Sequence, residues 1–138
     1  MAGKAKGKPQ FAAKELPVEE PTSSDKLRPV FCLEHIRTPH DVKNPDLTKD
    51  QRSAFAERLQ ELASVPWSQL KMSGRHAQGF ELLPVEKLKF KMPSAFEDTT
   101  KVHVFRYSGK LPMVGVRSNA TFHILAIERQ FGEVYDHA

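Results

Sequence analysis

The stretch VHVFRYSGKLPMVGVRSNATFHILAIERQFGEVYDH, residues 102–137, has the most regular pattern in the sequence. Its residues alternate at the period of a β-strand at the start, and its last apolar run is apolar on both faces, which is typical of a central strand. Ser108-Gly109-Lys110 and Ser118-Asn119 separate the apolar runs and have the composition of tight turns. The pattern predicts an antiparallel meander. Its three predicted strands span residues 102–107, 113–116 and 122–127.

Polar side chains follow directly after the last of these strands. Because apolar runs build the sheet, we expect any chemistry of this chain at the edge where the polar side chains gather. The residues of this cluster are Glu128, Arg129, Tyr135, Asp136 and His137.

A strand and a helix are predicted upstream of the meander. The apolar run 30–36 follows a proline and predicts a strand, and residues 37–47 read as a loop. Thr48 and Gln51 have the spacing of a capping box, with Asp50 in the first turn of the helix that follows. The helix should therefore begin directly after Thr48.

Two helices follow each other, because Pro66 cannot continue the first and suits the first turn of a second. Gly74 is the predicted end of the second helix. An apolar stripe at helical spacing predicts which side chains face the core. The residues predicted to be buried, on helices and strands together, are Phe55, Leu59, Leu62, Trp67, Val104, Ile124 and Ala126.

The order of elements is strand, helix, short helix and three antiparallel strands. This order predicts an α+β domain in which a helix pair packs on a small antiparallel β-sheet. At 138 residues the chain has room for one domain, which we place at residues 28–138. Residues 1–27 are rich in Lys, Ala, Gly, Pro, Glu and Ser and predict a disordered tail, either solubilising or in contact with phosphates.

Composition restricts the class of protein. The single cysteine, Cys32, excludes an internal disulfide and a metal–thiolate site. The apolar runs are too short to span a membrane and the N-terminus lacks a secretory pattern, so we expect no membrane partner and a cytoplasmic location. Residues 71–117 hold nine basic and four acidic residues, which permits contact with nucleic acid.

Known catalytic motifs are missing from the sequence: there is no Walker loop, GxGxxG, HExxH or nucleophile elbow. His103, His123 and His137 could in principle meet at a metal, but no ligand spacing supports this. We therefore expect no metal and no cofactor.

The sequence still offers basic residues near a tyrosine, and metal-free RNA cleavage uses such a set of side chains. A base takes the proton of the 2′-hydroxyl, cations stabilise the phosphorane, and an acid protonates the leaving 5′-oxygen. Arginine binds phosphate with two parallel hydrogen bonds, and tyrosine can stack on a base or donate a proton. The alternative is that these are ordinary residues of a strand edge.

The final stretch resembles the RelE/ParE-like toxin superfamily, whose meander ends in an arginine and, six residues on, a tyrosine. The resemblance extends over residues 30–137 and is specific in the last third. The matching features are Arg106, Ser108-Gly109, the run 113–116, Ser118-Asn119, the run 122–127, Arg129 and Tyr135. It implies a RelE-like fold, an arginine at the scissile phosphate (Arg129) and a tyrosine at the target base (Tyr135).

The resemblance implies a toxin-like, metal-independent mRNA endoribonuclease that acts at the ribosome and is controlled by an antitoxin. The alternative is a non-catalytic protein- or RNA-binding module, because Pro112 lies where such RNases have a second arginine. The catalytic candidates are Arg129, Tyr135, Arg106, Lys110 and His123, and the RNA-binding candidates are Lys71, Arg75, Lys101, His103 and Arg117.

Overall fold

A computed structural model describes residues 21–77 and 80–137. Five strands form one sheet in the order β1-β5-β4-β3-β2. β1 runs parallel to β5, and the other neighbours are antiparallel, so the sheet is mixed. The strands are β1 (Val30–Cys32), β2 (Glu81–Pro84), β3 (Lys101–Ser108), β4 (Leu111–Ser118) and β5 (Thr121–Ile127).

The predicted meander is confirmed as β3, β4 and β5. Each of its two turns contains a residue with a positive φ, Gly109 at 59° and Asn119 at 56°. Glycine and asparagine adopt this left-handed region most readily, so the turn chemistry agrees with the hairpins.

The capping box at Thr48 is confirmed, and it begins α1 (Lys49–Leu62). The side chain of Thr48 accepts from the backbone N–H of Gln51, and the Gln51 side chain accepts from the backbone N–H of Thr48. α2 (Trp67–Ala77) begins directly after Pro66, but it runs past Gly74, where we predicted its end. A glycine inside a helix costs only about 1 kcal/mol relative to alanine, which tertiary packing can offset.

Our prediction of a RelE-like helix pair on a small antiparallel sheet is wrong. The sheet has five strands and is mixed, because β1 joins one edge in parallel and β2 joins the other edge. Of the two helices, α1 packs along β3, whereas α2 contacts the 3-10 helix η1 (Pro21–Lys26). The first turn of α2 enters the core through Trp67 and Leu70.

Two segments near the N-terminal end of the domain differ from our prediction. The predicted strand 30–36 pairs only over Val30–Cys32, and the chain then leaves the sheet with Leu33 exposed. Residues 21–26, which we placed in the tail, form η1, and Asp25 within it makes ion pairs with the domain. The rest of the predicted tail, residues 1–20, lies outside the described residues.

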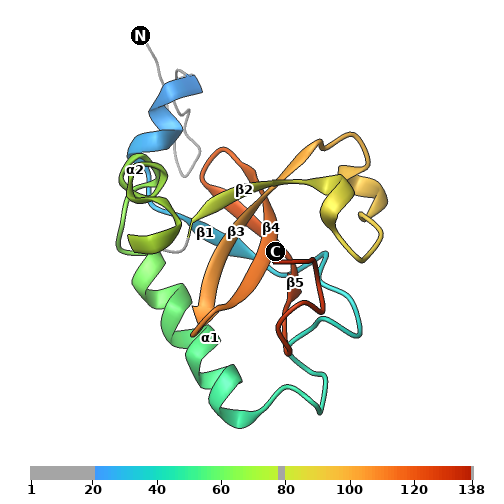
Figure 1. Cartoon of the computed structure of the whole chain (residues 1–138). Helices are drawn as coiled ribbons and strands as arrows, with labels where there is room; N and C mark the ends of the chain where they lie inside the picture. Colours follow the sequence, from blue (N-terminus) through green and yellow to red (C-terminus); the bar gives the residue numbers. More distant parts are fainter. Residues whose placement is uncertain (1–20, 78–79, 138) are drawn as a thin grey trace, which may run out of the picture.

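Each face of the sheet has its own core. The helix face, covered by α1 and the start of α2, holds large aromatic side chains, among them Trp67, Phe105 and Phe122. The opposite face, which we call the loop face, holds smaller side chains such as Val102, Val114 and Ala126. In Figure 1, α1 lies to the left of the strands and residues 85–100, drawn in yellow and light orange, lie to the right.

Irregular chain covers the loop face. Residues 85–100 contain two short 3-10 helices, η2 (Val85–Lys87) and η3 (Ser94–Phe96), and contribute Leu88 and Phe90 to this core. The C-terminal segment adds Val134 and Tyr135. Cover of this kind can leave hollows between the segments.

The predicted core is largely confirmed. Leu59 differs, because it is only partly buried and packs at the edge of the helix-face cluster. The fully or nearly fully buried members are Phe55, Leu62, Trp67, Val104, Ile124 and Ala126. Across residues 21–77 and 80–137, no helix is long and apolar enough to cross a membrane.

Candidate functional site

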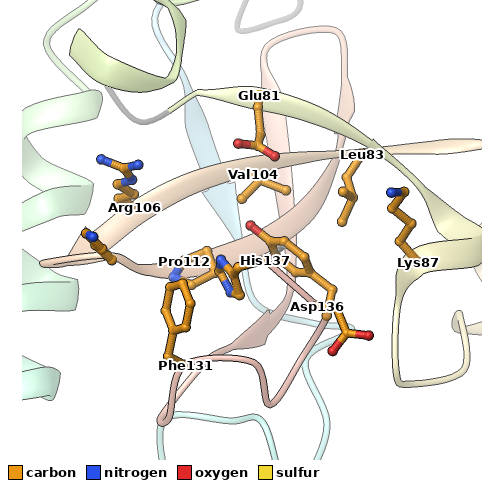
Figure 2. A pocket seen from close by; sticks show the side chains of 11 residues that line it. Glu81, Leu83, Lys87, Val104, Arg106, Pro112, Phe131, Asp136 and His137 are labelled. Carbon is orange, nitrogen blue, oxygen red and sulfur yellow. The ribbon is translucent and has the colours of Figure 1, made fainter.

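The loop face contains a cavity of about 390 Å³ between β2, β3 and the C-terminal segment, which we call the His137 cavity. Figure 2 shows His137 near its centre, with Arg106 on one side and Lys87 on the other. The residues that line it are Glu81, Leu83, Lys87, Val104, Arg106, Lys110, Pro112, Phe131, Tyr135, Asp136 and His137.

A buried carboxyl group orients His137. Glu128 has no exposed surface, and its Oε1 lies 2.8 Å from Nε2 of His137. Its Oε2 accepts a hydrogen bond of 2.9 Å from the backbone N–H of Val134. A Glu128 carboxylate accepts a hydrogen bond, so in the neutral ring this contact favours the tautomer with the proton on Nε2 and leaves Nδ1 as the acceptor. This is the arrangement of a histidine base with an acidic partner.

The His137 ring lies between two aromatic rings. Its centroid is 3.8 Å from that of Phe131 and 4.2 Å from that of Tyr135, and both pairs are stacked. Tyr135 is buried at 4% exposure, whereas Phe131 is exposed at 59%. Stacking on both faces together with the Glu128 contact fixes the ring plane, which a general base requires.

Local hydrogen bonds hold this end of β5 in place. The backbone N–H of Glu128 donates to Pro112 O over 3.0 Å, and the hydroxyl of buried Tyr107 donates to Glu128 O over 2.6 Å. Burial raises the pKa of Tyr107 well above its usual value, so the hydroxyl keeps its proton and stays a donor. Gly132, at φ 89°, then turns the chain back so that Tyr135 forms a bridge with Leu88.

Arg106 and Lys110 supply positive charge to the cavity. In the described part of the chain, neither side chain takes part in an ion pair. Asp136 is paired with Lys89 over 2.8 Å, which neutralises that carboxylate and lowers its pKa. The cavity thus combines an oriented histidine with two cations, Arg106 and Lys110, and its lining also includes the carboxylate of Glu81.

Of the predicted catalytic residues, Arg106, Lys110 and Tyr135 meet in the His137 cavity. Arg129 does not line it. Its guanidinium forms an ion pair with Glu133 and lies 3.3 Å from Asp46, and the hydrogen bond that it donates to Glu133 raises the pKa of Arg129. The catalytic role of Arg129 stays a prediction, and in this conformation its charge is already balanced.

His123, the remaining catalytic candidate, lies on β5 away from this cavity. Its ring is 5.1 Å from that of Phe96 and 6.1 Å from that of His35. Its Nδ1 is buried and has no partner among the described residues. Nothing places it near Arg106 or Lys110.

The predicted RNA-binding residues gather partly in a second hollow, the His103 cavity, at the β2 side of the helix face. Lys71, His103 and Arg117 line it. Burial first, and then the nearby cations, lower the pKa of His103 to about 4, so it is neutral at pH 7. Lys101 is exposed at the start of β3. Arg75 lies on α2, and its side chain is outside the described part of the structure.

Asp25 of η1 neutralises the cations of the His103 cavity. Its carboxylate lies 2.9 Å from Nζ of Lys71 and 2.6 Å from the guanidinium of Arg117. These two hydrogen bonds lower the pKa of Asp25. The Arg117 guanidinium also lies 4.4 Å from the centre of the Trp67 ring, a cation–π contact. The His103 cavity is therefore internally paired, unlike the His137 cavity.

Sequence reasoning missed the pairing of Glu128 with His137 and the roles of Phe131 and Lys87 in the cavity wall. One signal was available: an acidic residue directly after a strand that is apolar on both faces is expected to be buried and to need a partner. Among the described residues, no group of three or more His, Cys, Asp or Glu side chains is arranged to hold a metal ion. Comparison with protein-family models, curated proteins and solved structures finds no match to this chain.

Proposed function

We propose that this protein is a metal-independent endoribonuclease whose active site is the His137 cavity. The observation that carries the proposal is the contact of His137 with buried Glu128, made in a cavity that also holds Arg106 and Lys110, cations without an ion pair among the described residues. The proposal rests on this cavity and not on the arrangement of helices and strands, since fold alone does not determine activity.

His137 acts as the general base. Nδ1 takes the proton from a 2′-hydroxyl, and Glu128 stabilises the imidazolium that forms through the 2.8 Å contact at Nε2. The 2′-oxygen then attacks the neighbouring phosphorus, the bond from phosphorus to the 5′-oxygen breaks, and a cyclic 2′,3′-phosphate remains on one product. The other product leaves with a 5′-hydroxyl.

The cations act on the phosphate. Arg106 binds two of its oxygens, because a guanidinium matches the geometry of a phosphate. Lys110 stabilises the developing charge and donates a proton to the departing 5′-oxygen. The phosphorane carries more negative charge than the bound phosphodiester, so these contacts strengthen in the transition state and accelerate the reaction. Phe131, exposed and stacked on His137, offers a surface for a base.

RNA is the proposed substrate, and the cytoplasm, where mRNA is translated, is the proposed location. The resemblance to toxins adds the ribosome as a place of action and an antitoxin as a partner. An antitoxin that inhibits this site would have to cover the His137 cavity or hold the C-terminal segment away from β3.

The test is cleavage of mRNA, with and without translating ribosomes, by wild type, His137→Ala and Arg106→Ala. We expect each variant to lose at least about 100-fold in cleavage rate, the scale for loss of one preorganised catalytic group. The control is Lys49→Ala, which removes an exposed lysine that lines neither the His137 cavity nor the His103 cavity. Activity should persist in EDTA. If the wild type cleaves no RNA under any of these conditions, the proposed enzymatic activity is refuted.

A non-catalytic RNA-binding module is the second candidate. The observation that favours it is the engagement of Arg129 by Glu133 and Asp46, since the resemblance assigns this arginine to the scissile phosphate. The same assay separates the two functions. A module binds RNA through Arg106 and Lys110 without cleaving it, and His137→Ala then changes neither binding nor RNA length.

A further inference from the structure

A second basic cavity lies on the loop face, between the loop that follows β1 and residues 89–93. We call it the His40 cavity, and it has a volume of about 320 Å³. Its ten lining residues include three cations and two histidines, and none is acidic. The cations are Arg37, Lys89 and Lys91, and the histidines are His35 and His40, of which burial lowers the pKa of His40.

Part of the lining of the His40 cavity is apolar. The apolar residues that line it are Leu125 of β5, Phe90, Pro39 and Pro93. The ring of His40 lies 5.7 Å from that of Phe90. A nucleotide has the matching chemistry, because its phosphate needs cations while its base or sugar can pack on flat apolar groups.

Residues 87–91 connect this cavity to the His137 cavity. Lys87 lines the His137 cavity, whereas Lys89 and Lys91 line the His40 cavity. The segment runs beside the C-terminal segment, with Leu88 bridged to Tyr135 and the backbone N–H of Lys89 donating to Val134 O over 2.7 Å. Four residues span at most about 14 Å, so the two cavities lie within reach of a short piece of single strand.

The acidic neighbours of the His40 cavity are already paired. Asp136 is bound by Lys89 and Glu133 by Arg129, and Glu34 lies 3.8 Å from Nε2 of His35. Lys91 is exposed, and the guanidinium of Arg37 contacts only backbone oxygens, of Glu34 and Ile36. Lys91 and Arg37 therefore keep their charge for a ligand.

We propose that the His40 cavity is a subsite for a nucleotide that flanks the cleaved bond in the same RNA strand. Lys91 and Arg37 hold its phosphate, and the Phe90 side of the cavity packs on its base or sugar. Lys87 and Lys91 lie at the two ends of residues 87–91 and each lines one of the two cavities, so the strand passes from one cavity to the other. This inference rests on the proposed function, because the flanking nucleotide is defined by the cleavage site.

The test compares RNA ligands of two lengths. Binding of a ten-nucleotide RNA whose 2′-hydroxyls are methylated, and which therefore cannot be cleaved, is measured by fluorescence anisotropy. Lys91→Glu should weaken it about 10-fold, the scale of losing one charge-assisted contact. The loss of that contact should also reduce the magnitude of the slope of log K against log salt by about 0.7. Lys49→Glu, with the same change of charge, is the control and should bind as wild type does.

A dinucleotide is too short to occupy both cavities, so its cleavage should not change in Lys91→Glu. Arg37→Gln provides a second variant with the same expectation, should Lys91→Glu prove unstable. Equal loss for both ligand lengths, or no loss for the ten-nucleotide RNA, would overturn the subsite while leaving the effect of His137→Ala intact. If AMP or inorganic phosphate binds at Lys91 but does not compete with the longer RNA, the cavity is a site for a free nucleotide and the subsite is refuted.

Discussion

The two faces of the sheet are filled in different ways. The helix face buries Trp67, Phe105 and Phe122 completely under α1 and the start of α2. The loop face buries small aliphatic side chains under irregular chain, and both the His137 cavity and the His40 cavity open on it. On the helix face the His103 cavity lies only at the β2 side, whereas on the loop face segments with few backbone constraints leave room for ligands between them.

The two faces also differ in how their charged side chains are paired. Beside the helix face, Lys71 and Arg117 share the carboxylate of Asp25. On the loop face, Arg106 and Lys110 enter no ion pair of the described part. One face is therefore arranged for stability and the other for binding, and the following predictions test that difference.

The largest effect is expected for Trp67→Ala on the helix face. The side chain has no exposed surface, and its Nε1–H donates to Ala120 O over 2.9 Å. The free energy of unfolding should fall by about 3–5 kcal/mol, through lost transfer energy and a cavity in rigid surroundings. Urea denaturation measures it.

The matched variant is Leu125→Ala on the loop face, where the residue is 3% exposed and lines the His40 cavity. We expect the free energy of unfolding to fall by about 2 kcal/mol, the low end for such a substitution, because the irregular chain around Leu125 can collapse into the space. A cost for Leu125→Ala as large as that for Trp67→Ala would show that the loop face is packed as rigidly as the helix face.

The second effect is a dependence on pH that originates from His103. Its pKa is about 4 in the folded protein and about 6.5 when unfolded, so below pH 6.5 the unfolded state binds more protons. The stability contribution is complete above pH 6.5 and is lost as the pH falls toward 4, by a total of about 3 kcal/mol. In His103→Leu, this part of the loss should disappear from denaturation curves recorded between pH 4 and 7. Parallel pH curves for variant and wild type would contradict burial of a neutral His103.

Much of the sheet follows from local pattern, but its edges do not. The alternation of β3 and the turns at Gly109 and Asn119 are local properties, and so is the capping box of α1. The parallel pairing of β1 with β5 joins Val30 to Thr121, and the β2 pairing joins Leu83 to Val102 across the 85–100 segment. No local pattern encodes which distant segment a strand will join, so the fold was predicted with too few strands and too simple a topology.

The candidate site was predictable in part for the same reason. Arg106, Lys110 and Tyr135 were singled out by residue type, and they do lie around one cavity. The pairing of Glu128 with His137 depends on the turn at Gly132, and the contact of Arg129 with Asp46 joins residues from distant parts of the chain. Residue types indicate candidate groups, whereas these tertiary contacts determine whether each charge is available.

Gly115→Ala tests how tightly the helix face is packed against the sheet. Gly115 lies where β4 and β5 shift register, and a Cβ there would lie 2.8 Å from Cε1 of Phe122 and closer still to the backbone oxygen of His123. The clash should cost about 1–3 kcal/mol, because backbone or a buried ring must move. Thermal unfolding measures it, and Ser118→Ala at the exposed end of the same strand should change stability by less than about 0.5 kcal/mol. A neutral Gly115→Ala would mean that this region adapts as freely as we expect of the loop face.

The smallest effect concerns the paired cations. Asp25→Asn removes the carboxylate that Lys71 and Arg117 share, and the free energy of unfolding should fall by at most about 1 kcal/mol, because Asp25 is near the surface. The pKa of Asp25 is lowered in the folded state, so this contribution is present above about pH 4 and is lost as the pH falls through the folded pKa. Wild type and Asp25→Asn should therefore differ at pH 7 and converge at pH 2. Arg106→Gln, which removes a cation without an ion-pair partner, should leave stability within about 0.5 kcal/mol at pH 7 and weaken RNA binding. If Arg106→Gln destabilises the protein more than Asp25→Asn does, Arg106 supports the fold and the division of charge between the two faces is refuted.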